Sequence, residues 1–157
     1  MEHQQDVLTE IVTASQIKRS KLLPWWIKIF MWIFLIIGFL IPILLIAAVA
    51  GFDTQLAIYG LETNNAFTLT GILLILVFAL KGFVSFGMVK EKDWAIKLGA
   101  IDAILGIVIC VFTSYIYPFI SEESASFSLL KFELIFLIPY LIKLLRIKND
   151  WESARAY

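Results

Sequence analysis

Residues 25–50 read WWIKIFMWIFLIIGFLIPILLIAAVA, an apolar run in which Lys28 is the only charged side chain. At about 1.5 Å per residue, a helix of this length reaches about 39 Å, longer than the roughly 30 Å hydrocarbon core of a bilayer. Pro42, one turn after Gly38, removes a backbone donor and marks the expected bend. The run therefore predicts a membrane-crossing helix that tilts or bends.

Three further apolar runs follow, at about 67–89, 94–120 and 129–147. Each is close to or longer than the roughly 20 residues that a crossing helix needs. Strands of a membrane β-barrel would alternate with a period of two, whereas these runs are continuous. The sequence predicts an all-α integral membrane protein, an antiparallel bundle of four transmembrane helices.

Composition agrees with a membrane protein. Apolar residues make up 61% of the chain and charged residues 17%, and the mean hydropathy is +0.88. Soluble domains average about 45–50% apolar and about 25% charged residues. The formal net charge is zero, so we expect the lipid bilayer, and not nucleic acid, as the partner of this surface.

The basic residues predict the orientation, because Lys and Arg beside membrane helices favour the cytosolic side. One side of the predicted topology holds nearly all of them: Lys18, Arg19, Lys21, Lys28, Lys90, Lys92, Lys97, Lys143, Arg146, Lys148 and Arg155. The other side holds only Lys131. Both termini and the turn at 90–93 are therefore expected in the cytosol, with the chain in a bacterial cytoplasmic membrane.

Two terminal segments flank the transmembrane domain, which we place at 25–147. Residues 1–24 carry apolar side chains at helical spacing, followed by Lys18, Arg19 and Lys21. This pattern fits either an amphipathic helix on the cytosolic membrane surface or a solvated tail. Residues 148–157 are expected to form a cytosolic tail, with Trp151 as an interface anchor.

Lys81 and Asp102 are the informative charges. Lys81 lies ten residues before Glu91, and Asp102 lies ten residues after Lys92, so both have the same depth in an antiparallel hairpin about the turn. That depth is about 12 Å from the ends of the apolar runs. An unpaired charge at such a depth costs a few kcal/mol, so the two opposite charges are expected to meet as an intramembrane ion pair.

Small residues share the Asp102 side of its helix. At 100° per residue, Ala95, Gly99, Gly106 and Cys110 lie within about 80° of Asp102. Small side chains let membrane helices approach closely. This stripe is the predicted helix-packing face.

Three interpretations of the two charges remain open. They form a structural ion pair that locks the hairpin, or Lys81 reaches toward the cytosol while Asp102 bonds elsewhere, or both belong to a proton- or ion-coupling site. Glu133, near the outer end of the fourth run, is explained by the helix dipole and an interface position without a function.

The chain lacks the residues of most metal, redox and catalytic sites. Cys110 is the only cysteine and His3 the only histidine, which excludes a CxxC pair and most histidine-based sites. We therefore expect no cofactor, no metal and no enzymatic activity. The leading hypothesis is a structural or accessory subunit of a homo-oligomer or larger membrane complex. The alternative is a small oligomeric transporter or channel that uses Lys81 and Asp102.

Overall fold

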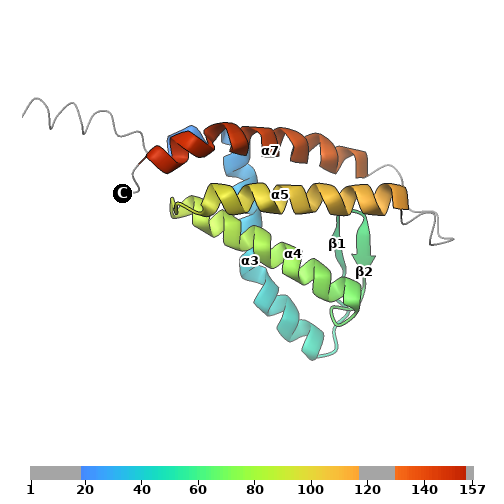
Figure 1. Ribbon diagram of the computed structural model, residues 1–157. Coiled ribbons are helices and arrows are strands. Elements are labelled where there is room, and N and C mark those ends of the chain that lie inside the picture. The colour runs from blue at the N-terminus through green and yellow to red at the C-terminus, as the bar shows by residue number, and fades with distance from the viewer. Residues whose placement is uncertain (1–18, 117–129, 155–157) are drawn as a thin grey trace, which may run out of the picture.

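The computed structural model describes residues 19–116 and 130–154, which are mostly helical (Figure 1). Its elements, in chain order, are α2 (Arg19–Leu22), α3 (Trp25–Val49), β1 (Leu56–Ile58), β2 (Leu61–Thr63), α4 (Leu69–Val89), α5 (Ala95–Val111), the π-helix η1 (Phe112–Ile116) and α7 (Leu130–Ser153). The expected all-α fold thus gains an antiparallel β-hairpin, β1–β2, between the first two apolar runs.

In the part of the chain that the structure describes, three helices are long and apolar enough to cross a membrane. They are α3, α4 and the segment Ala95–Ser114, with mean hydropathies of 3.0, 2.4 and 2.3. The fourth expected run also forms a helix, α7, but charged residues interrupt it, and it is not among these three apolar helices. Its uncharged stretch, 134–142, is bounded by Glu133 and Lys143 and is shorter than the roughly 20 residues of a typical span.

Two helix ends differ from the apolar runs. The third run was expected to reach residue 120, but α5 ends at Val111 and η1 at Ile116, and 117–129 lie outside the described residues. At the other end, α7 continues to Ser153, beyond residue 147 where the apolar run stops. Hydropathy shows which residues are apolar, whereas the ends of a helix are set by where its backbone hydrogen bonding stops.

The long helices pack in chain order: α3 against α4, α4 against α5, and α5 against α7. Figure 1 shows α5 and α7 side by side, while α3 crosses the molecule at a steep angle to both. From their tight turn, α4 and α5 diverge, and the β-hairpin fills the opening between their far ends. We call these two ends of the molecule the turn end and the hairpin end.

Gly38 of α3 and Gly82 of α4 mark the point where these two helices cross. A Cβ atom built on either glycine would lie 2.7 Å from the Cα atom of the other. Only glycine permits such a backbone approach, as at other small-residue crossings of membrane helices. Gly38 was expected to help bend its helix, and the structure gives it this contact.

Arg19 and Trp151 close the turn end. Arg19 donates from Nη1 to the Glu91 carbonyl at 2.6 Å and pairs through Nη2 with Asp93 at 2.6 Å. Trp151 donates from Nε1 to the Lys92 carbonyl at 3.0 Å. Both side chains are buried. Arg19 belongs to the segment expected either on the membrane surface or in solvent, and Trp151 was expected as an interface anchor, but each packs against protein. Instead they hold α2 and the end of α7 against the α4–α5 turn.

Residues 1–18, which include the rest of the expected amphipathic segment, lie outside the described residues.

Candidate functional site

Lys81 and Asp102 face each other across α4 and α5. The Lys81 Nζ atom donates to Asp102 Oδ2 at 2.9 Å, and each side chain is 4% exposed. The two residues that the sequence paired by depth are thus in direct contact. Burial of both charges makes removal of either one strongly destabilising, because the other would be left unpaired away from water.

Two aromatic rings complete the surroundings of the Lys81 ammonium. The Phe34 and Tyr59 rings each lie with their centroids 5.0 Å from Nζ. This is within the distance at which an aromatic face attracts a cation. Phe34 precedes Gly38 by one helical turn, so the close crossing of α3 and α4 brings its ring over Lys81. The sequence did not predict that either ring would lie beside Lys81.

The second carboxylate oxygen of Asp102 is unsatisfied. Oδ1 is buried and has no hydrogen-bond partner among the residues that the structure describes. A buried acceptor without a donor costs about 1–3 kcal/mol. An ion pair that served only to join two helices would gain stability by filling this position, so the free oxygen is a feature that needs an explanation.

Tyr59 sits at the tip of the hairpin and reaches into the helices. Tyr59 and Gly60, with φ of 56° and 77°, form the two-residue turn. Both central residues of such a turn need positive φ, which a bulky side chain rarely adopts. The Tyr59 side chain is nevertheless buried, and a Cβ atom on Gly106 would lie 2.6 Å from its hydroxyl oxygen.

Polar contacts on both sides hold the Tyr59 backbone in this conformation. The Thr113 hydroxyl, carried by η1, donates to the Tyr59 carbonyl at 2.7 Å. The Tyr59 N–H donates to Glu133 Oε1 at 3.2 Å. Burial, and then the nearby Asp102 carboxylate, raise the pKa of the Tyr59 phenol above its ordinary value, so the hydroxyl stays protonated. A strained residue kept in place by three elements is typical of a functional position.

Glu133 therefore has a more central place than the outer interface position expected for it. Besides Tyr59, it contacts Cys110, whose Sγ donates to Oε2 at 3.5 Å. Both partners are neutral donors. Among the side chains that the structure describes, those of 19–114 and 133–154, no Lys or Arg lies within ion-pair distance of this carboxylate.

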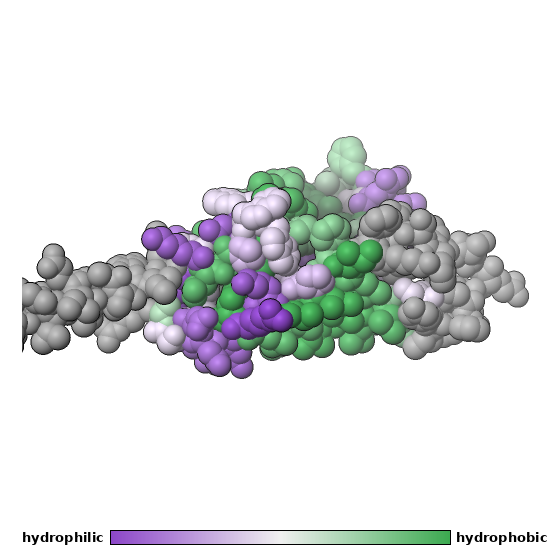
Figure 2. Space-filling model, turned by 90° about the horizontal axis from the view of Figure 1, so that it is seen from above, coloured by the Kyte–Doolittle hydropathy of each residue, from purple (hydrophilic) through white to green (hydrophobic). Residues whose placement is uncertain are grey.

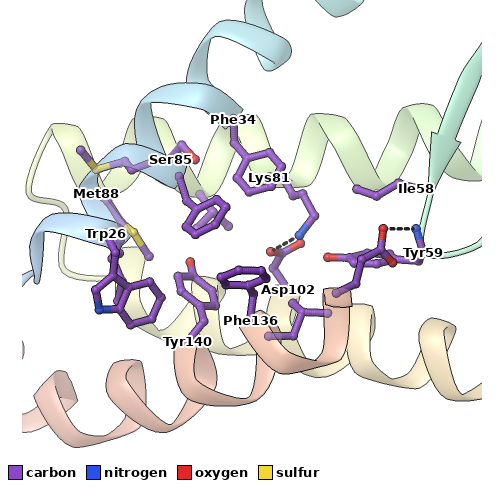
Figure 3. Close-up of a pocket in the computed structure, with 16 residues that line it drawn as sticks. Trp26, Phe34, Ile58, Tyr59, Lys81, Ser85, Met88, Asp102, Phe136 and Tyr140 are labelled. Carbon is purple, nitrogen blue, oxygen red and sulfur yellow. Dashed lines mark hydrogen bonds and ion pairs between the residues drawn. The ribbon is translucent and has the colours of Figure 1, made fainter. Parts of the chain in front are cut away.

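These groups line one cavity of about 250 Å³ between α3, α4, α5, α7 and the hairpin. Figure 3 shows Lys81 and Asp102 meeting in its middle, with Tyr59 on one side and Phe34, Phe136 and Tyr140 around the other. Phe30 and Phe136, and likewise Trp26 and Tyr140, meet between α3 and α7 at ring-centroid distances of 5.8 and 6.4 Å. The remaining lining residues are Ile27, Met31, Ile58, Val84, Ser85, Met88, Glu133 and Leu137. The described lining of the cavity is thus largely apolar and aromatic, and its charged side chains are Lys81, Asp102 and Glu133.

The predicted packing face is buried along its whole length: Ala95, Gly99, Gly106 and Cys110. Its partners change along the helix. Gly99 faces Met88 and Val84 of α4 and Leu144 of α7, whereas Gly106 faces the Tyr59 ring. The stripe therefore receives both neighbouring helices and the hairpin, all within one chain.

In the part of the chain that the structure describes, no group of three His, Cys, Asp or Glu side chains is placed to hold a metal ion. A scan against models of protein families, a search of curated proteins and a search of solved structures each found no match to this chain.

Proposed function

We propose that this protein is a small transporter with four crossing helices in a bacterial cytoplasmic membrane, both termini lying in the cytosol. One observation carries the proposal. The buried Lys81–Asp102 pair lines a cavity of about 250 Å³, and one oxygen of Asp102 lacks a partner. A purely structural pair is expected to be enclosed and fully hydrogen-bonded, whereas a site that receives a ligand keeps polar groups facing a cavity.

The distribution of charge supports this topology. Figure 2 shows hydrophilic side chains gathered at the turn end and apolar side chains along the middle of that face. Exposed Lys90, Lys92, Lys97 and Arg146 belong to the turn end or to the last turns of α7 that pack beside it. Basic residues near helix ends favour the cytosolic side. Helix α7, packed along α5, supplies the fourth crossing in this proposal despite its short uncharged stretch.

The proposed activity moves a molecule without covalent change. Lys81 and Asp102 neutralise each other, and the only histidine of the chain is His3, far along the sequence from every cavity residue. The accessory-subunit hypothesis relied on the small-residue stripe as a surface for a partner. That stripe is covered by α4, α7 and the hairpin of the same chain, so it no longer supports an external partner.

Substituted-cysteine labelling tests the proposal. Ser85 lines the cavity and is 4% exposed; it would be changed to cysteine in a Cys110→Ala background. A membrane-impermeant cationic methanethiosulfonate reagent is then applied to right-side-out and to inverted vesicles in separate experiments. A transporter exposes its cavity to each side in turn, so we expect Ser85→Cys to react in both.

Two control positions calibrate the labelling. Asn64→Cys, exposed beside the hairpin, should react only from the outer side, which also tests the orientation. Ala103→Cys, fully buried and outside the cavity lining, should not react. A Ser85→Cys variant that stays unreactive while Asn64→Cys reacts would mean a closed, dry ion pair, and transport would be excluded.

A further inference from the structure

The cavity has room for a small ligand with an apolar body. Its volume of about 250 Å³ lies just below the range of drug-sized ligand pockets, about 300 to 1,000 Å³, so it suits a smaller molecule. Aromatic faces from three elements form much of its wall: Phe30 and Phe34 of α3, Phe136 and Tyr140 of α7, and Tyr59 of the hairpin. Such walls suit a flat, single-ring group.

Among the side chains that the structure describes, the charges in the lining sum to one negative unit. Lys81 contributes a positive charge, and Asp102 and Glu133 contribute negative ones. Asp102 is balanced by Lys81, whereas the described partners of Glu133 are a backbone N–H and a thiol, which leave its charge in place. In surroundings of low polarity, this excess repels anions and favours a cation.

Lys81 itself displays how this site holds an ammonium ion. Its Nζ atom is bound by one carboxylate oxygen at 2.9 Å and flanked by two aromatic rings at 5.0 Å. The other oxygen of the same carboxylate is buried without a partner. The cavity that Asp102 lines offers a second ammonium group the same two kinds of contact, a carboxylate and the aromatic rings of α3 and α7.

We propose that the cavity binds a small organic cation, a protonated amine attached to an apolar group, through Asp102, Glu133 and the surrounding aromatic rings. This inference rests on the proposed function, whose cargo it specifies. The N–H groups of the amine donate to the carboxylate of Asp102, its charge balances Glu133, and its apolar part lies between the rings of α3 and α7.

The test is a calorimetric titration of the full chain in detergent micelles with four probes of similar size. Phenethylammonium is the expected ligand. Benzyltrimethylammonium keeps the charge without an N–H donor, phenethyl alcohol is neutral, and phenylpropanoate is an anion. One charge-assisted hydrogen bond corresponds to about tenfold in affinity or more. We expect phenethylammonium to bind about tenfold more tightly than benzyltrimethylammonium or phenethyl alcohol, and phenylpropanoate to bind most weakly.

Variants identify the groups responsible. Asp102→Asn removes the acceptor charge, but it also strands Lys81 and is prone to misfold. Glu133→Gln provides a second variant, because an amide oxygen still accepts from the Tyr59 N–H and so preserves folding. It should weaken phenethylammonium about tenfold and leave phenethyl alcohol unchanged. Phe136→Leu should weaken both cations, whereas Phe39→Leu, at a side chain 82% exposed and outside this cavity, should weaken neither.

Equal affinity for phenethylammonium and phenethyl alcohol, or a Glu133→Gln variant that binds the ammonium unchanged, would overturn the cationic ligand. So would the absence of ammonium binding. In each of these cases, a Ser85→Cys variant that reacts from both sides would leave the transport proposal standing, whereas an unreactive one would remove it as well.

Discussion

Neutralising Lys81 and Asp102 singly and together gives the most decisive perturbation of this structure. The variants are Lys81→Met, Asp102→Asn and the double substitution. At the observed 2.9 Å, the attraction between the two charges is about 6 kcal/mol for an effective dielectric constant of about 20. Because both side chains are only 4% exposed, solvent screens this attraction little, but their lost hydration offsets most of it.

Each single substitution strands one buried charge, and each should lower the free energy of unfolding by about 3–5 kcal/mol. The double substitution leaves no buried charge, only an uncharged amide. It should therefore cost less than either single substitution, and the coupling energy between the two sites should be about 3 kcal/mol or more. Exchanging the charges, with Lys81→Asp and Asp102→Lys, should likewise be tolerated better than either single reversal.

Reversible unfolding in mixed micelles of mild detergent and dodecyl sulfate, followed by tryptophan fluorescence, measures these free energies. Lys97→Met is the matched control. Lys97 pairs with Glu152 at 3.3 Å, but the two side chains are 56% and 38% exposed, so its loss should change stability by less than about 1 kcal/mol. If the double substitution cost the sum of the two single ones, Lys81 and Asp102 would not interact, and the site described above would be wrong.

Three further substitutions test the elements that build the site. Gly82→Leu should lower stability by about 1–3 kcal/mol or more in a thermal melt, since its side chain would strike the backbone at Gly38; an unchanged melting temperature would contradict the helix crossing. Arg19→Met should cost about 1.5–3 kcal/mol in the same assay through its lost charged hydrogen bonds, whereas exposed Lys21→Met should be neutral. Tyr59→Asn suits the turn better yet should destabilise the protein by about 2–4 kcal/mol, because it removes a buried ring; a stabilised variant would show that the ring contributes little.

Much of the helical framework was predictable from residue order. Continuous apolar runs predicted the positions of α3, α4 and α5, because backbone groups inside lipid must satisfy their hydrogen bonds within the segment. Equal spacing from the turn at 90–93 paired Lys81 with Asp102, and helical periodicity identified Ala95, Gly99, Gly106 and Cys110 as a buried face. Each of these inferences uses a regularity along one helix or across one short hairpin.

The connecting segment between α3 and α4 was where prediction stopped. Tyr59 and Gly60 stand in a short polar stretch with no periodic pattern, which indicates a loop and nothing about where its tip lies. The insertion of Tyr59 depends on Gly106 of α5, Thr113 of η1 and Glu133 of α7, all more than forty residues away along the chain. Such contacts carry no local signal in a single sequence.

The amino-acid order alone determined which segments are apolar helices, which small residues share a face, and which two charges have matching depth, because all three follow from fixed rise and rotation along a helix. Only the tertiary structure decided that α3 crosses α4 at Gly38 and Gly82, that Arg19 and Trp151 are buried, and that Tyr59 and Glu133 join Lys81 and Asp102 around one cavity. These outcomes depend on the angles at which whole helices meet. Those angles are set by the packing of many side chains from distant segments at once.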